Sequence, residues 1–449
     1  MTHQDLLANL PPIPADDLLP SIREALESSE RTIVVLDDDP TGTQTVFDVP
    51  VLTRLDADSI RDAIDDAPPV LFLLTNSRAL TAKETTELHQ NLGKILKEFA
   101  DDIIVISRSD STLRGHFPLE TNILRDALGI PEAPTLFIPF FEAGGRLTVN
   151  NTHYVVEGNT ATPAHLTPFA NDNTFPFSHS HLPDYIVEKT GAPIDVQSIS
   201  LEDLRSGNVV EKLASLPDSS TCIVNATCLR DLDSLSLALH QNKRRFIIRS
   251  AASFVQSLGG ITSRPPLDPW QMQDLAPNPN GGLIIVGSHV PKTTAQLNHL
   301  LENFPNITAI ELNVPDLLNS TFDAQRTALD IQTALSSGKT VVLFTSRDRI
   351  DGEDNLVISR TVSQALVSIV RSIKIRPKFL IAKGGITSSD IATDALGVKQ
   401  AMVLGQILLG VPVWTIGNET RHPGLAYIIF PGNVGGDDAL TQAYQKLTS

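Results

Sequence analysis

Short runs of apolar residues recur along the chain, and each is followed by a loop and then by an amphipathic stretch. In the first half the runs are Ile33–Leu36, Val70–Leu74, Ile103–Ile106, Leu136–Ile138, Cys222–Val224 and Phe246–Ile248. In the second half they are Leu283–Val286, Ala309–Leu312, Val341–Phe344, Phe379–Ile381 and Tyr427–Phe430. Short apolar runs of this kind are typical of strands buried on both faces of a parallel sheet.

Helix candidates lie between these runs. Residues 361–373 show the pattern well, because their apolar positions follow the three- and four-residue spacing of one helix face: Val362, Ala365, Leu366, Ile369 and Val370. Alternating strands and helices predict an α/β fold in which mainly parallel sheets are flanked by helices.

The segment 263–282 interrupts this alternation. It contains five prolines and ends in two glycines, which can continue neither a helix nor an inner strand. We therefore expect two domains, 31–262 and 283–449, joined by a linker at 263–282 and preceded by an N-terminal extension at 1–30.

The net charge of the chain limits the classes of molecule that we expect it to bind. The chain has 35 Lys and Arg against 52 Asp and Glu, a formal net charge of −17. Such a surface repels nucleic acid and anionic lipid, so neither is an expected partner. The N-terminus lacks the pattern of a secretory signal and the most apolar stretch, 401–414, is too short to span a bilayer, which together predict a cytoplasmic protein. An anionic small molecule would need a local cluster of cations.

The residues that follow the apolar runs of the first half supply such a cluster. These strand-end segments are Asp37–Gly42, Thr75–Arg78, Ser107–His116 and Gly144–Arg146. In open parallel sheets ligands collect beyond the carboxyl ends of the strands. Arginine offers paired donors that fit a carboxylate, and aspartate accepts hydrogen bonds from sugar hydroxyls. The pattern favours a binding site for a polyhydroxy anion.

The second half offers glycine and hydroxyl groups instead of charge. Gly287–His289, Lys383–Asp390 and Pro431–Asp438 each follow an apolar run. Glycines at such turns let backbone N–H groups approach phosphate oxygens. The sequence contains no GxxxxGK[ST] motif, which excludes a P-loop nucleotide site.

Taken in order, these segments resemble the four-carbon acid sugar kinase family over about residues 31 to 445. The matching motifs are Asp38–Gly42, Ser77-Arg78, Arg108–Gly115, Gly145-Arg146, Gly287–His289, Gly384–Thr387 and Pro431–Asn433. The DSTLRG segment within Arg108–Gly115 is the most specific of them.

The resemblance implies an N-terminal substrate domain, a C-terminal ATP domain and an active site in the cleft between them. The activity it implies is transfer of the γ-phosphoryl group of ATP, with Mg²⁺, to the terminal hydroxyl of threonate, erythronate or 3-oxo-tetronate. It places the sugar acid on Asp39, Arg78, Arg108, Ser109, Asp110 and Ser111. It places ATP on Ser288, Gly384, Gly385, Ile386, Thr387 and Gly432.

Three positions depart from the family pattern. Arg108 stands where lysine is commoner, which keeps the charge but changes its reach. Ile386 stands where aspartate is frequent, so the resemblance supplies no magnesium ligand. Phe430 precedes the last glycine loop where many relatives have lysine, so one cation for the phosphates is missing there.

Phosphoryl transfer needs a group that accepts a proton from, or orients, the attacking hydroxyl. Asp39 is the first candidate, Asp38 the alternative and Asp110 the third. We expect the substrate carboxylate and hydroxyls to be held by the nearby guanidinium groups, which are those of Arg78, Arg108, Arg114 and Arg146.

Two other classes of function fit part of the pattern. Asp37 and Asp39 match the D-x-D-x-T motif of phosphohydrolases of the haloacid dehalogenase type, but nothing in that scheme calls for DSTLRG. A non-catalytic sugar-acid sensor would need the arginines but not the glycine loops. Assembly as a homodimer is left open.

Overall fold

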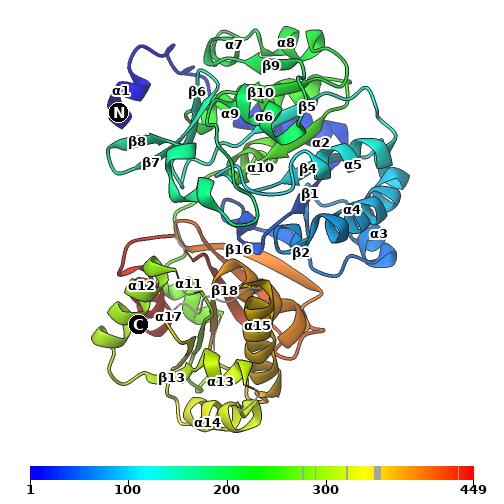
Figure 1. The fold of residues 1–449 in the computed structure, drawn as a ribbon. Coiled ribbons are helices and arrows are strands. Elements are labelled where there is room, and N and C mark those ends of the chain that lie inside the picture. The colour runs from blue at the N-terminus through cyan, green and yellow to red at the C-terminus, as the bar shows by residue number, and fades with distance from the viewer. Residues whose placement is uncertain (276–277, 289, 320–321, 348–354, 433) are drawn as a thin grey trace. The chain divides into compact units, whose positions relative to one another are not determined.

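The computed structural model describes residues 1–449 except 276–277, 289, 320–321, 348–354 and 433. The chain divides into two compact units, Met1–Ser263 and Arg264–Ser449 (Figure 1). Both units consist of a sheet with helices on its faces, which confirms the predicted α/β fold class.

The first unit is built on a parallel sheet with the strand order β2-β3-β1-β4-β11-β5-β10-β9. Its strands are β1 (Thr32–Asp37), β2 (Val49–Leu52), β3 (Val70–Leu74), β4 (Ile103–Arg108), β5 (Thr135–Ile138), β9 (Val196–Ile199), β10 (Thr221–Val224) and β11 (Ile247–Ser250). A small antiparallel sheet is formed by β6 (Arg146–Val149), β7 (Thr152–Glu157) and β8 (Thr160–Pro163).

Helices cover both faces of the first parallel sheet. They are α1 (His3–Leu7), α2 (Leu19–Ser29), α3 (Ala57–Asp65), α4 (Ala82–Leu96), α5 (Leu119–Leu128), α6 (Leu182–Thr190), α7 (Leu201–Arg205), α8 (Val209–Ser215), α9 (Leu229–Gln241) and α10 (Ala252–Leu258). Val34 and Leu36 of β1 pack with α3, α4 and α5 in one hydrophobic cluster. Ile33 and Val35 point to the other face and are equally buried, so β1 has no solvent-facing side.

The residues before β1 form part of this unit. Ile22 and Leu26 of α2 are buried, and α2 packs against α9. The backbone N–H of Ala161 in β8 donates to the carbonyl of Met1. The segment that we expected to be an extension therefore contributes to the packing of the first unit.

The second unit has the strand order β13-β14-β12-β15-β18-β17-β16, in which β17 runs antiparallel to both of its neighbours and the other neighbouring strands are parallel. Its strands are β12 (Leu283–Val286), β13 (Thr308–Leu312), β14 (Val341–Thr345), β15 (Leu380–Lys383), β16 (Gln400–Leu408), β17 (Val411–Ile416) and β18 (Ala426–Phe430). Its helices are α11 (Pro269–Asp274), α12 (Pro291–Asn303), α13 (Val314–Leu318), α14 (Ala324–Ser336), α15 (Asn355–Ser372), α16 (Gly385–Asp390) and α17 (Ala439–Thr448). A π-helical turn, Ile391–Ala395, follows α16.

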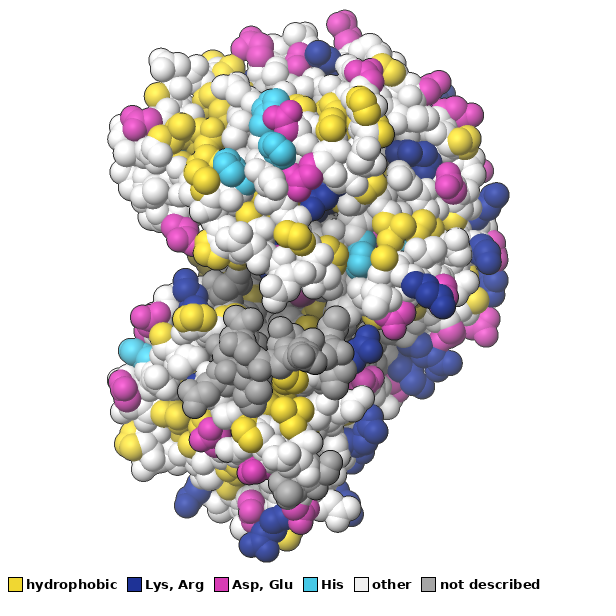
Figure 2. All heavy atoms as spheres, viewed as in Figure 1, with side chains coloured by type: hydrophobic (Ala, Val, Ile, Leu, Met, Phe, Trp, Pro, Cys, Tyr) yellow, Lys and Arg dark blue, Asp and Glu magenta, His cyan; other side chains and the backbone are white. Residues whose placement is uncertain are grey.

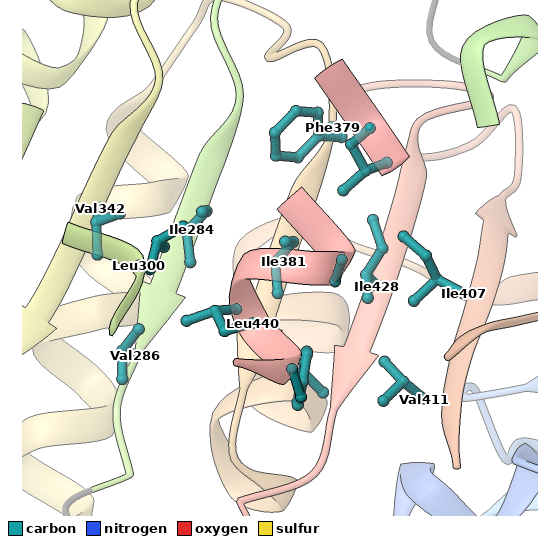
Figure 3. Packing of buried hydrophobic residues seen from close by; sticks show 14 of the residues in the cluster. Ile284, Val286, Leu300, Val342, Phe379, Ile381, Ile407, Val411, Ile428 and Leu440 are labelled. Carbon is teal, nitrogen blue, oxygen red and sulfur yellow. The ribbon is translucent and has the colours of Figure 1, made fainter. Parts of the chain in front are cut away.

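One face of the second sheet is covered by α11, α12 and α17. Figure 3 shows Leu300 of α12 and Leu440 of α17 packed among Ile284, Ile381 and Ile428 of the strands. Met272 of α11 is fully buried in the same cluster. The expected linker 263–282 thus contains a helix that belongs to the core of the second unit.

The strand registers bring the strand-end segments together within each unit. Asp37, the last residue of β1, pairs with Leu74 on β3 and with Arg108 on β4. In the second unit Lys383 on β15 pairs with Val286 on β12 and with Phe430 on β18. Within each unit, therefore, the loops after these strands start at one edge of the sheet.

All the apolar runs named above are strands, and residues 361–372 lie within α15. The pattern missed β2, β9, the small sheet β6–β8 and the antiparallel pair β16–β17. Helix α16 begins at Gly385, directly after Gly384, and the π-helical turn continues it from Ile391.

Acidic and basic side chains are interspersed over the surface of each unit on the face drawn in Figure 2. Among the described residues, no helix is both long and apolar enough to cross a membrane. A cytoplasmic location remains a prediction.

Candidate functional site

The end of β1 carries three consecutive carboxylates, and the first of them is enclosed. Asp37 is 1% exposed, and its Oδ1 accepts a hydrogen bond from Nη1 of Arg108 at 3.1 Å. A Cβ atom at Gly42 would lie 2.1 Å from Oδ2 of Asp37. Only glycine at position 42 leaves space for this carboxyl group.

The second and third carboxylates contact the loops after β3 and β4. Asp38 accepts hydrogen bonds from the Ser109 hydroxyl at 3.1 Å and from Arg108 at 3.4 Å. Asp39 forms an ion pair with Arg78 and accepts a hydrogen bond from the backbone N–H of Thr41 at 2.8 Å.

Asp110 extends this network into the DSTLRG loop. Its carboxylate lies 3.3 Å from Nη1 of Arg78 and 2.8 Å from Nε of Arg114. Arg114 also contacts Asp172 at 3.4 Å. We call the connected side chains the acidic–arginine network: Asp37, Asp38, Asp39, Arg78, Arg108, Ser109, Asp110 and Arg114.

The four carboxyl groups of this network differ in their acidity. Burial raises the pKa of Asp37 to about 7, although Arg108 opposes the shift, and burial also raises the pKa of Asp38. Burial alone would raise the pKa of Asp39, but Arg78 and Thr41 outweigh it and hold that pKa below its usual value. Arg114 and Arg78 likewise depress the pKa of Asp110. Asp39 and Asp110 are therefore ionised at neutral pH, whereas Asp37 is about half protonated.

Arg146, at the start of β6, has a different environment. Among the described residues it has no salt-bridge partner, and its Nε makes no hydrogen bond. Its guanidinium lies 5.5 Å from the ring centre of Phe169, over which Arg114 also lies at 5.2 Å. Burial lowers the pKa of Arg146, and the charge of Asp110 only partly offsets this. Arg146 is a partly buried cation beside the network without a carboxylate of its own.

Three buried side chains hold the DSTLRG loop by its carbonyl groups. His153 Nε2 lies 2.7 Å from the carbonyl oxygen of Ser111, and the Tyr185 hydroxyl donates to that of Leu113 at 2.7 Å. Arg249 Nη2 lies 3.3 Å from the carbonyl oxygen of Arg114. Burial lowers the pKa of His153 to about 4, so the ring is neutral and Nε2–H can donate.

Sequence reasoning missed these three residues. Arg249 directly follows the apolar run 246–248, so the rule that selected the other strand ends would have found it. His153 and Tyr185 lie in β7 and α6, where no strand-end signal marks them. The predicted residue Ser111 is 8% exposed and follows Asp110 in the same loop.

The second unit brings together the glycine loops that were expected to bind ATP. A Cβ atom on Gly384 would lie 3.3 Å from both the Cβ of Ser288 and the Oγ1 of Thr387. One on Gly432 would lie 3.2 Å from the Ser288 hydroxyl. The Thr293 hydroxyl donates to the carbonyl of Gly432 at 2.8 Å and links this loop to α12.

These contacts make Ser288 the meeting point of three turns. Gly384 has a φ of 119°, a backbone angle that residues other than glycine rarely adopt. Helix α16 starts directly after it, at Gly385. Such a cradle of small residues fits the close approach of phosphate groups to the backbone. Ile386 is 46% exposed. The expected motif residues His289 and Asn433 lie outside the described residues.

Two cations lie beneath these loops. Lys383 Nζ donates to the carbonyl of Pro431 at 3.1 Å and lies 4.0 Å from the ring centre of Phe430. Arg347 Nη1 donates to the carbonyl of Ser288 at 2.7 Å. The position before the last loop has phenylalanine instead of the family's lysine, and the ammonium of Lys383 on the adjacent strand occupies the space over its ring.

In the part of the chain that the structure describes, no three His, Cys, Asp or Glu side chains are arranged to hold a metal ion.

A comparison with models of protein families matches residues 33–258 to a sugar-binding N-terminal domain, which covers about half of the chain. The chain belongs to this family. Residues 283–440 match a nucleotide-binding C-terminal domain. The family's sugar-binding domain contains the acidic–arginine network, and its nucleotide-binding domain contains the glycine loops.

Solved structures with the same fold share little sequence. A Salmonella typhimurium LT2 protein, solved under a provisional description as a tRNA synthase, is 15% identical with a TM-score of 0.69, and the match covers 92% of this chain and 99% of that one. A Haemophilus influenzae protein of the family of unknown function DUF1537 is 16% identical with a TM-score of 0.61, covering 92% and 100% of the two chains. A comparison with curated proteins gives no significant match.

The enclosed carboxyl group of Asp37 gives a prediction about stability. Between pH 4 and 7 Asp37 ionises in the unfolded chain but stays largely protonated in the folded one, so wild-type stability falls as the pH rises through this window. The Asp37→Asn substitution removes the carboxyl group that titrates. We expect the variant to gain stability relative to wild type by a few kcal/mol between pH 4 and 7, measured by urea unfolding at several pH values.

Asp65→Asn is the matched control, because Asp65 is exposed on the same unit. Comparison with this variant separates the effect of the enclosed carboxyl group from the general effect of losing one acidic side chain. A pH-independent difference for Asp37→Asn would show that Asp37 is ionised in the folded protein at low pH.

Proposed function

We propose that the chain is an ATP-dependent kinase that phosphorylates the terminal hydroxyl of a four-carbon sugar acid: threonate, erythronate or 3-oxo-tetronate. The presence of sugar-binding and nucleotide-binding domains in one chain supports a sugar kinase. The choice of an acid rests on the charges of the first unit.

Arg146 is the observation that carries this choice. Arg78, Arg108 and Arg114 are each paired with aspartates of the same unit. Among the described residues, Arg146 has no such partner and stands beside the DSTLRG loop with free donors. A carboxylate on the substrate would supply the missing anion through a charge-assisted, two-pronged contact.

The aspartates suit the hydroxyl groups of the same substrate. Asp39 and Asp110 stay ionised because arginines depress their pKa values, so both remain acceptors at neutral pH. In phosphoryl transfer the attacking hydroxyl needs orientation and an acceptor for its proton late in the reaction, more than a strong base. We assign this role to Asp39, the most exposed of the three consecutive carboxylates.

The nucleotide would lie on the glycine loops, with its phosphates near Ser288, Gly384, Gly385, Ile386, Thr387 and Gly432. Mg²⁺ bound to those phosphates would supply charge neutralisation. The chain's own contribution is to hold the phosphate groups on backbone N–H donors and to keep the acceptor hydroxyl oriented.

The haloacid dehalogenase alternative requires Asp37 to attack phosphorus. Asp37 is 1% exposed, lies against Gly42 and is partly protonated at neutral pH, so it is a poor nucleophile. A sugar-acid sensor without catalysis gives no role to the nucleotide-binding domain. Both observations favour the kinase.

The direct test is ADP release by the full-length protein with MgATP and a panel of C4 to C6 sugar acids. We expect turnover with one four-carbon acid, and a preference for erythronate over the neutral alditol erythritol of about ten- to hundredfold. Equal use of erythronate and erythritol would contradict carboxylate recognition, and no ADP release with any acid would contradict the assignment.

Arg146→Met tests the carboxylate contact, because methionine keeps an unbranched apolar stem but loses the guanidinium group and its charge. We expect KM for the acid to rise about ten- to hundredfold, with a smaller change in kcat. Arg61→Met, which removes a cation from the surface ion pair with Glu98 on the same unit, is the control. If KM for the acid is unchanged in Arg146→Met, the carboxylate binds elsewhere.

Asp39→Asn tests the hydroxyl-orienting role. The amide can keep the contact with the N–H of Thr41 but cannot accept the proton of the substrate hydroxyl. We expect kcat to fall about 10²–10⁴-fold, with the affinity for MgADP unchanged. Near-normal turnover would exclude Asp39, and loss of a phosphatase activity in Asp37→Asn would favour the dehalogenase alternative.

A further inference from the structure

The nucleotide loops of the second unit rest on two cations whose only hydrogen bonds, within the described part of the chain, go to oxygen atoms of the loops and of β14. Lys383 is 0% exposed, and its Nζ donates to Pro431, the first residue of the last glycine loop. Arg347 donates from Nη1 to the carbonyl of Ser288 and from Nε to that of Thr345 at 2.8 Å. Each cation thus contacts one of the loops that meet at Ser288.

Neither cation has an acidic partner in the part of the chain that the structure describes. This is unusual in a chain with 52 acidic against 35 basic residues. Taking a charge out of water without an anion to compensate it is costly, because the lost hydration is not replaced. A cation kept in this way indicates a ligand that supplies the anion.

The pKa values of Lys383 and Arg347 agree with a ligand that supplies the anion. Burial, together with the charge of Lys292 on α12, lowers the pKa of Lys383 to about 7. Burial also lowers the pKa of Arg347, and the charge of Glu311 offsets this only in part. Both groups would be stabilised in their charged forms by an anion nearby.

The unused donors define the chemistry of that anion. Lys383 uses one of its three N–H donors. Arg347 uses three of its five, two on Thr345 and one on Ser288. The two cations lie at different loops of the same cradle, which suits an extended anion with several oxygen atoms. A phosphate chain has this form.

We propose that Lys383 and Arg347 bind the phosphate chain of the nucleotide, Lys383 from beneath the loop at Pro431-Gly432 and Arg347 from beneath Ser288. The proposal rests on the proposed kinase function for the identity of the ligand. It adds two side chains to a site that sequence motifs describe by glycine and hydroxyl residues alone.

The test is calorimetric titration of full-length protein with MgADP and, separately, with adenosine, which lacks phosphate. Lys383→Met and Arg347→Met should each weaken MgADP binding by about ten- to hundredfold and leave adenosine binding unchanged. Arg347→Lys keeps the charge and should recover part of the loss. If the two cations had a purely structural role, the variants would weaken the binding of MgADP and of adenosine together.

Lys399→Met is the matched control. Lys399 is exposed and precedes β16, which runs parallel to β18 through two antiparallel pairings, so it lies at the opposite edge of the sheet from the loops. The Lys399→Met substitution removes the same charge from the same unit and should leave MgADP binding unchanged.

The outcomes separate the two proposals. If wild type binds MgADP and both methionine variants bind it equally well, the cation assignment is wrong and the kinase proposal stands. If wild type binds tripolyphosphate but neither MgADP nor adenosine, and the variants lose tripolyphosphate, the cations bind phosphate and the kinase proposal is wrong. Should Lys383→Met fail to fold in a thermal melt, the Arg347→Met and Arg347→Lys pair decides the assignment.

Discussion

The structure of the first unit depends on keeping three carboxyl groups close together at the end of one strand. Three consecutive aspartates would repel one another at the end of β1 if they were all ionised and unpaired. Arg78 and Arg108 reach them from the neighbouring strands and pair with them directly. The register of β1 with β3 and β4 is what makes this possible, because it ends the three strands at the same level. A shift of register would separate the charges from their partners.

Under the proposed function, the two units attract their anionic ligands in opposite ways. In the first unit Arg78, Arg108 and Arg114 are already paired with aspartates, so the network provides shape and acceptors, and Arg146, which has no salt bridge among the described residues, provides the attraction. In the second unit the loops carry few charges, and the attraction comes from backbone N–H groups and from the cations beneath them. The first arrangement suits a substrate with many hydroxyls and one charge, and the second suits a highly charged chain of phosphates.

Much of the fold follows from the sequence because parallel strands buried on both faces leave an unmistakable apolar run. The antiparallel pair β16–β17 has a different pattern: Ala401 and Val403 are buried while Met402 between them is exposed, a period of two that differs from a continuous apolar run. The strand-end rule selected residues that lie close together, because sheet topology fixes where strand ends meet. It could not show which arginines are neutralised, since ion pairing depends on distances between distant segments. For the same reason His153 and Tyr185, which hold the loop from β7 and α6, carried no local signal.

Because Asp37 and Gly42 are in contact, the residue that can stand at one of these positions depends on the residue at the other. Any side chain at position 42 would overlap the carboxyl group of Asp37, since even a Cβ atom would lie 2.1 Å from its Oδ2. A substitution at position 42 is therefore tolerable only after position 37 has become smaller. Because an early loss at position 37 would leave Arg108 with only Asp38 as a partner, the two changes face an ordered path with a disfavoured intermediate. Related chains should keep both residues or replace both, and a directed-evolution library that varies either position alone should return only the original residue at Gly42.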